Sequence, residues 1–129
     1  MIFLDTCVLI DHSKDKLILD LSGGYCASSI VKMEFKAGAR DKKELQKLNR
    51  ILGHIKCVQT DQDILDLAEF LIERYALSHG MGIYDAIIAA TCMVYDLPLW
   101  TFNQRDFRFI DGLLLERIDA KDFSRPEQP

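Results

Sequence analysis

The feature that most constrains the fold is the alternation of short apolar runs with longer stretches of helical periodicity. The runs are Ile2–Leu4, Tyr25–Ser28, Ile55–Gln59, Leu99–Phe102 and Leu113–Ile118. Their apolar character is continuous, as expected of strands covered on both faces. Because strands that alternate with helices form parallel sheets, the pattern predicts an α/β fold. We expect a three-layer α/β/α sandwich with a central, mostly parallel sheet.

Two helices are predicted in the first half of the chain. Ser28 or Ser29 can cap a helix that ends near Ala37, with Gly38 beyond it. The stretch from Asp41 to His54 is rich in Lys and Gln and is interpreted as an exposed helix.

Two more helices are predicted in the second half. Thr60, with Asp63 three residues later, offers a capping arrangement for a helix whose apolar stripe runs from Ile64 to Tyr75. Gly80 and Gly82 end that helix, and a very apolar helix follows from about Tyr84 to Tyr95.

Length and composition indicate one domain in a cytoplasmic protein. A chain of 129 residues with 49% hydrophobic content can bury an ordinary core. We expect one domain over residues 1–122 and a flexible tail over residues 123–129. The sequence shows neither a secretory signal nor an apolar run long enough to span a membrane. The four cysteines form no C-x-x-C pair, so we interpret them as reduced, mostly core thiols.

The net charge of −4 argues against a protein that binds nucleic acid through an overall positive charge. It does not exclude a nuclease, because bound divalent cations reverse the field around clustered carboxylates. A local basic patch formed by Lys42, Lys43, Lys47 and Arg50 could contact phosphates. The alternative for these residues is an ordinary solvated helix face.

Three acids stand where surface carboxylates are not expected. Asp5 directly follows the first apolar run, at the strand end where open α/β sheets bind ligands, although it could equally cap the next helix. Glu34 shares a helical face with Ile30, Met33 and Ala37, which we expect to look inward. A buried, ionised carboxylate needs a cation or strong donors, and a divalent metal is one supplier.

The third acid and a fourth position complete the set. Asp85 aligns with Ile88, Ala89 and Cys92, but a first-turn Asp also favours the helix dipole without binding anything. Asn103 follows the strand that ends at Phe102; it offers a neutral carbonyl ligand or forms an Asx turn.

These positions can converge at one edge of the sheet. Oxygen ligands of this kind suit Mg²⁺ or Mn²⁺, which favour phosphate chemistry. The sequence therefore predicts phosphodiester hydrolysis at this edge. Asp106, three residues after Asn103, could instead cap or pair with a neighbouring arginine.

Four blocks of the chain resemble the PIN-domain family. They are Met1–Asp11 (MIFLDTCVLID), Ser28–Phe35 (SSIVKMEF), Ile83–Thr91 (IYDAIIAAT) and Leu99–Phe107 (LWTFNQRDF). The resemblance spans nearly the whole chain and extends to the VapC-like toxins of this family. It implies a PIN-like sandwich and magnesium-dependent cleavage of RNA. It also implies a cognate antitoxin and a homodimer.

The resemblance also implies roles for individual residues. Asp5, Glu34 and Asp85 become the acidic core, with Asp5 and Asp85 as direct metal ligands. Candidate contacts to substrate or water are Thr6, Ser29, Thr101 and Asp106, for which capping or turn roles are the alternative. Cys7 stands where the family often has Asn. Asn103 stands where many members have Asp, which favours one firmly bound Mg²⁺.

Three other functions remain to be weighed. A phosphotransferase with Asp5 as nucleophile would need a second Asp at the position of Cys7. Cysteine phosphatase chemistry would need an Arg six positions after a cysteine, and none stands there. A catalytically weak PIN-like module that binds RNA or protein is favoured by Asn103 and disfavoured by the three acids.

Overall fold

The computed structural model describes residues 1–116 and places a parallel sheet at the centre of the molecule. The strands are β1 (Ile2–Leu4), β2 (Tyr25–Ser28), β3 (Lys56–Val58) and β4 (Leu99–Trp100), in the order β3-β2-β1-β4. Phe3 of β1 pairs with Cys26 on one side and with Leu99 on the other. A single bridge joins Leu99 to Leu115, so part of the expected fifth strand is present; residues 117 and 118 lie outside the described residues.

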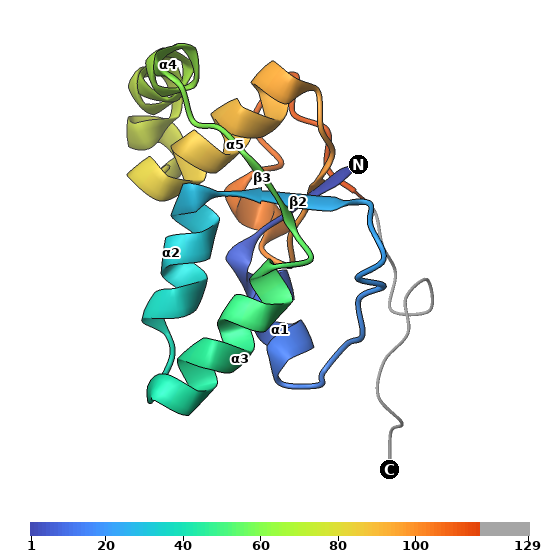
Figure 1. The fold of residues 1–129 in the computed structure, drawn as a ribbon. Helices are drawn as coiled ribbons and strands as arrows, with labels where there is room; N and C mark the ends of the chain where they lie inside the picture. The colour runs from blue at the N-terminus through green and yellow to red at the C-terminus, as the bar shows by residue number, and fades with distance from the viewer. Residues whose placement is uncertain (117–129) are drawn as a thin grey trace.

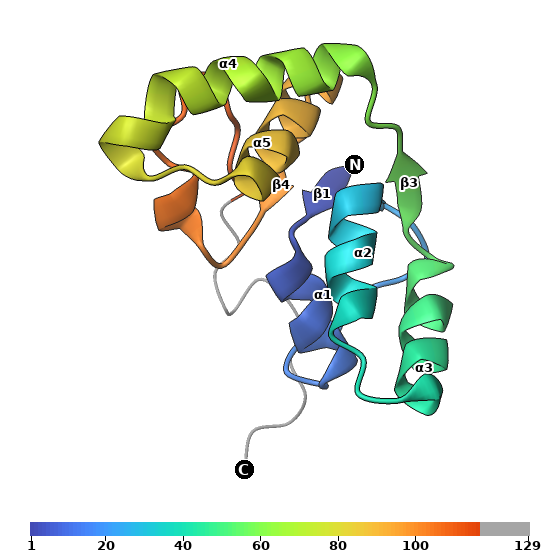
Figure 2. The same cartoon turned by 90° about the vertical axis from the view of Figure 1, so that its left-hand side faces the viewer.

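The helices cover both faces of this sheet. The chain leaves β1 through α1 (Thr6–Ser13), then passes α2 (Ser29–Ala37) and α3 (Lys42–Leu52), which lie on one side (Figures 1 and 2). It returns through α4 (Gln62–His79) and α5 (Ile83–Tyr95) on the other side. The expected three-layer α/β/α sandwich is confirmed. Strands β2 and β3 are added on one side of β1, and β4 is added on the other, so the strand order reverses between β1 and β4. This is the switch point where α/β sheets bind ligands.

Helix α5 is the most deeply buried helix of the described chain. Seven consecutive residues, from Ala86 to Cys92, are buried. Two fully buried sheet residues, Phe3 and Leu4, belong to the same core. Burying a large apolar side chain stabilises the fold by about 1.5–3 kcal/mol. Helix α4 packs extensively along α5 and supports it from the side away from the sheet core.

Two expectations about burial were wrong. β3 is an edge strand with Lys56 and Cys57 exposed, because no further strand covers it in residues 1–116. Helix α3 is not exposed all round: Leu48, Ile51 and Leu52 are buried and join the core.

The helix ends also differ in part from the sequence pattern. Asp61, not Thr60, caps α4, and its Oδ1 accepts the N–H of Ile64 at 3.0 Å. The buried Thr60 hydroxyl has no hydrogen-bond partner in residues 1–116. Gly80 ends α4 in the left-handed conformation with φ 67°, as expected of a glycine stop. Ser28 caps α2 by position but makes no side-chain capping bond.

The cysteines are less buried than expected, because only two of the four lie in the core. All four cysteines are free; Cys26 and Cys92 are buried, Cys7 is half-buried and Cys57 is exposed. In residues 1–116, each helix is too short or too polar to cross a membrane.

Candidate acidic active site

Asp5 lies at the carboxyl end of β1 and is 7% exposed. Its Oδ1 accepts the N–H of Thr6 at 2.8 Å, and its Oδ2 accepts the hydroxyl of Thr101 at 2.8 Å. Its own N–H donates to the carbonyl of Trp100 at 3.0 Å. Asp5 therefore caps α1 and also joins the ends of β1 and β4.

Cys7 and Thr101 form further contacts between the beginning of α1 and the end of β4. The N–H of Phe102 donates to Cys7 Sγ at 3.4 Å, and that sulfur lies 3.8 Å from Asp5 Oδ2. The N–H of Asn103 donates to Thr101 Oγ1 at 3.0 Å. Burial raises the pKa of the Cys7 thiol, and the charge of Asp5 adds to this effect. The thiol thus stays protonated, and its contacts with Asp5 and Phe102 join α1 to the residues after β4.

Glu34 joins the site from α2, but not from a buried face as expected. The buried residues of α2 are Val31 and Phe35, and they turn Glu34 and Met33 outward. Thr6 Oγ1 donates to Glu34 Oε1 at 3.1 Å. Because the Glu34 carboxylate is exposed, its position does not require a compensating cation. The hydrogen bond with Thr6 nevertheless places it beside Asp5.

Asp85 lies in the first turn of α5 and is half-buried. Its pKa is raised from 3.8 to about 6, first by desolvation and then by the negative charges of Asp5, Asp106 and Glu34. Coulombic effects of this kind need short separations. Four carboxyl groups from four separate segments of the chain therefore share one region at the carboxyl edge of the sheet.

Asp106, rather than Asn103, contributes the charge from the fourth segment. A short 3-10 helix, η1 (Gln104–Asp106), begins after Asn103, and the N–H of Asp106 donates to the Asn103 carbonyl at 3.0 Å. This turn brings Asp106 within electrostatic range of Asp85. The amide side chain of Asn103 is exposed and makes no hydrogen bond in residues 1–116. Sequence reasoning gave Asp106 too little weight.

Two of the hydroxyl candidates lie at the site and one does not. Thr6 contacts Glu34, and Thr101 contacts Asp5. Ser29 Oγ instead lies 4.0 Å from the sulfur of Cys57 on the edge strand. The signal that could have separated them is position: Thr6 and Thr101 adjoin the ends of the two central strands.

The residues present fit a hydrated divalent cation better than a fully caged one. In residues 1–116, no three His, Cys, Asp or Glu side chains are arranged as a ready metal cluster. The donors at the site are carboxylate oxygens, and Mg²⁺ typically keeps several waters while one or two carboxylates bind it. Asp85, with its raised pKa, and the adjacent Asp5 are the groups whose repulsion a cation would relieve.

Fold and site together define an α/β protein with a carboxylate cluster at the switch point of a parallel sheet. The PIN domain family model matches residues 2–113, and the chain belongs to that family. It is 36% identical over 120 residues to Ribonuclease VapC1 of Methanocaldococcus jannaschii, covering 92% of this chain and 87% of that protein. It is 32% identical over 122 residues to Ribonuclease VapC19 of Mycobacterium tuberculosis, covering 88% and 97%.

Solved structures give the same fold. A toxin–antitoxin complex from Klebsiella pneumoniae aligns with a TM-score of 0.71 and 27% identity, over 88% of this chain and 96% of that one. VapBC2 from Rickettsia felis, bound to a DNA fragment from its promoter, aligns with a TM-score of 0.76 over 92% and 100%. At 22% identity, the second similarity concerns the fold alone.

Proposed function

We propose that this chain is an endoribonuclease that hydrolyses RNA phosphodiester bonds and acts as the toxin of a VapBC-type pair. The observation that carries the proposal is that Asp5, Glu34 and Asp106 lie near enough to Asp85 for their charges to raise its pKa. The ribonuclease names of the relatives support the substrate. The toxin–antitoxin complex from Klebsiella pneumoniae supports a cognate antitoxin as partner.

The cofactor in this proposal is Mg²⁺, with Mn²⁺ as a substitute. Asp5 and Asp85 would hold it, with Glu34 and Asp106 nearby. A divalent ion in such a site activates water and stabilises the charge of a phosphoryl oxygen. The oxygen-only donor set supports this choice of metal.

The chain's own residues orient the site. The hydroxyl of Thr101 and the N–H of Thr6 hold the two oxygens of Asp5 in fixed directions. The Thr6 hydroxyl holds Glu34 in the same way. Because Asp85 has a pKa of about 6 without metal, it is mostly ionised near neutral pH and becomes protonated in mild acid. We therefore expect protons to compete with the cation at Asp85, so that the Mg²⁺ concentration needed for RNA cleavage rises as pH falls through about 6.

We further propose that the protein works in the cytoplasm as a homodimer. The free cysteines support a reducing compartment. The exposed apolar side chains of Phe70, Leu77 and Leu114 leave surface for a partner. Analytical ultracentrifugation tests the homodimer, and a monomer at micromolar concentration would contradict it.

The test of the activity is an incubation of purified protein with structured RNAs in Mg²⁺, in EDTA, and as the Asp5→Asn variant. We expect cleavage in Mg²⁺ that EDTA stops and the variant lacks. Equal cleavage by Asp5→Asn would identify a contaminating nuclease. No cleavage by the unmodified protein, with RNA binding retained, would favour a catalytically weak binding module.

A further inference from the structure

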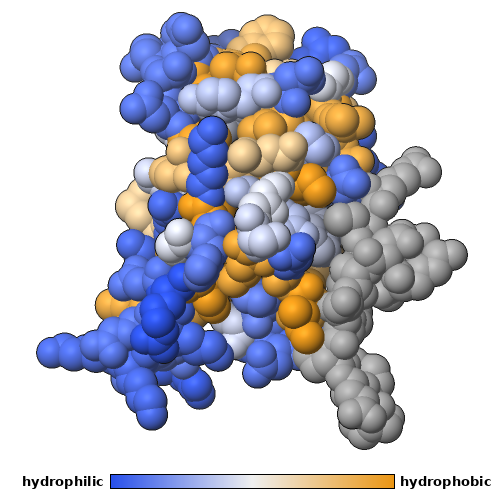
Figure 3. Space-filling model, turned by 45° about the vertical axis from the view of Figure 1, so that its right-hand side comes forward, coloured by the Kyte–Doolittle hydropathy of each residue, from blue (hydrophilic) through white to orange (hydrophobic). Residues whose placement is uncertain are grey.

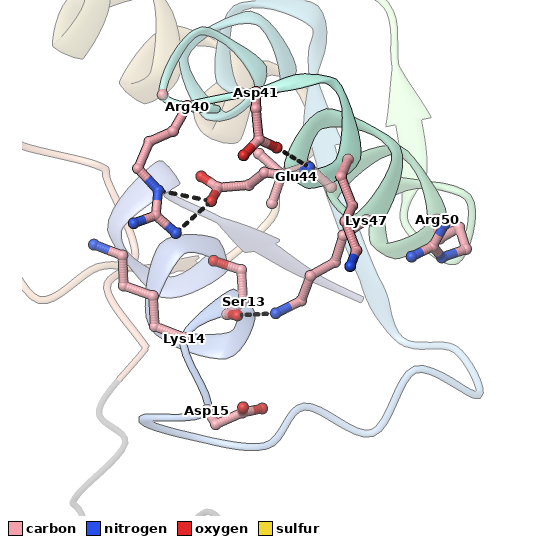
Figure 4. A pocket seen from close by; sticks show the side chains of 11 residues that line it. Ser13, Lys14, Asp15, Arg40, Asp41, Glu44, Lys47 and Arg50 are labelled. Atoms are coloured by element: carbon pink, nitrogen blue, oxygen red, sulfur yellow. Dashed lines mark hydrogen bonds and ion pairs between the residues drawn. The ribbon is translucent and has the colours of Figure 1, made fainter.

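A second polar site lies at the far end of α1 from the acids. A cavity of about 700 Å³ lies between the end of α1, the α2–α3 connection and one side of α3. Its lining includes five basic residues and three acidic ones: Lys14, Arg40, Lys43, Lys47, Arg50, Asp15, Asp41 and Glu44 (Figure 4). A chain with net charge −4 thus concentrates positive charge at one cavity.

Internal contacts occupy two of the three acidic residues and two of the five basic ones. Arg40 pairs with Glu44 at 2.8 Å, and Asp41 caps α3 by accepting the Glu44 N–H at 2.7 Å. Lys47 donates to the Ser13 carbonyl at 2.6 Å and ties α3 to the end of α1. These contacts neutralise one cation and one anion of the lining and fix its walls.

Three basic side chains of the cavity are left for a ligand. Within residues 1–116, Lys14, Lys43 and Arg50 make no hydrogen bond or ion pair. In Figure 4, Lys14 lies on the same side as Arg40, and Arg50 lies at the opposite end. Figure 3 shows hydrophilic side chains gathered at the height of the α2–α3 connection. The cavity is therefore open, polar and unbalanced toward positive charge.

The cavity and the acidic site are joined by two helices. Helix α1 begins beside Asp5 and ends at Ser13 on the cavity wall, which is about 11 Å at 1.5 Å per residue. Helix α2 carries Glu34 and leads to Gly38 and Arg40 of the lining. The acidic site and the cavity therefore lie about the length of α1 apart, a separation that a polynucleotide of several residues can span.

We propose that this cavity binds backbone phosphates of the RNA whose scissile bond lies at the acids. The inference rests on the proposed function for its substrate. Phosphate contacts position nucleic acid without reading its sequence. The net charge of the chain and the carboxylates of the acidic site repel RNA. Lysine and arginine at the cavity would attract its phosphates.

The experiment measures RNA binding directly, by fluorescence anisotropy of a labelled 20-nucleotide RNA in EDTA at several salt concentrations. The cavity variant is Lys43→Gln/Arg50→Gln. The matched control is Lys42→Gln/Lys56→Gln, which removes two exposed lysines that do not line the cavity. We expect the cavity variant to bind about three- to tenfold more weakly, with its salt slope reduced by roughly 1.4 as two phosphate contacts are lost.

Three outcomes would overturn the inference. The first is equal affinity and slope for the unmodified protein and the cavity variant. The second is an equal loss in the control variant, which would indicate bulk charge alone. The third is weakened binding of polyglutamate with RNA binding unchanged, which would assign the cavity to an acidic protein segment.

Cleavage kinetics separate this inference from the proposed function. With Mg²⁺, the cavity variant should raise KM for the 20-nucleotide RNA, leave kcat unchanged, and cleave a dinucleotide as the unmodified protein does. Failure of the unmodified protein to cleave either RNA would refute the function, while the anisotropy result would still decide the cavity.

Discussion

At the scale of single residues, Asp85 is the most informative group. Its pKa of about 6 means that folding favours its neutral form. The resulting stabilisation is fully present below about pH 4 and is lost as pH rises through 6. Asp85→Asn cannot ionise. In EDTA it should therefore gain about 1–2 kcal/mol relative to the unmodified protein between pH 4 and pH 7.5, a figure reduced because Asp85 is half-exposed.

Urea unfolding at both pH values measures this difference. Glu73→Gln on α4 is the matched control, because Glu73 is exposed and lies outside the acidic site. A stability difference for Asp85→Asn that is the same at pH 4 and pH 7.5 would contradict the raised pKa.

Thr101 provides a second prediction at this scale. Its buried hydroxyl donates to Asp5 and accepts from the Asn103 N–H. Thr101→Val keeps the shape and removes both hydrogen bonds, so it should cost about 1–3 kcal/mol of stability. Thr101→Ser should recover most of the loss. Thermal unfolding of the two variants tests this, and a Val variant as stable as the Ser variant would oppose it.

Single residues also show which parts of the site could be predicted from the sequence. Asp5 could be placed because the end of an apolar strand in a parallel sheet is a defined position. The predicted inward orientation of Glu34 was wrong, because packing buries the face with Val31 and Phe35 instead. Asp106 depends on a 3-10 turn after β4, and no hydrophobic period specifies the path of such a turn.

At the scale of elements, the beginning of α4 offers a sharp comparison of two neighbouring residues. Asp61 accepts the Ile64 N–H, whereas the Thr60 hydroxyl has no partner in residues 1–116. Asp61→Ala should lower the free energy of unfolding by about 1 kcal/mol, the usual cost of losing a cap. Thr60→Ala should cost less than half as much. Urea denaturation measures both, and the reverse order would restore Thr60 as the cap.

The sequence predicted which helices and strands form more accurately than it predicted where they end. The alternation of strands and helices predicted β1, β2, α2, α4 and α5 to within a few residues. β4 ends at Trp100, two residues earlier than expected, and the next residue, Thr101, donates a hydrogen bond to Asp5. Strand propensity does not predict such a side-chain contact, which joins residues far apart in the sequence.

At the scale of the whole molecule, the fold brings four segments to one edge and so concentrates negative charge there. A bound divalent ion should relieve this repulsion and stabilise the protein. At one hundred times its dissociation constant, Mg²⁺ should add about 2.7 kcal/mol. Differential scanning fluorimetry should show a rise in Tm that Asp85→Asn loses and Glu73→Gln keeps. An unchanged Tm in the unmodified protein would contradict metal binding.

The most direct test of the account is single-turnover cleavage of RNA in Mg²⁺ by variants at each position of the acidic site. The variants are Asp5→Asn, Glu34→Gln, Asp85→Asn and Asp106→Asn, with Glu73→Gln as the control. We predict that each site variant loses roughly a hundredfold or more in rate, as loss of one charged group at a reacting centre does, while the control cleaves normally. Undiminished cleavage by Asp85→Asn or Asp5→Asn would contradict the account.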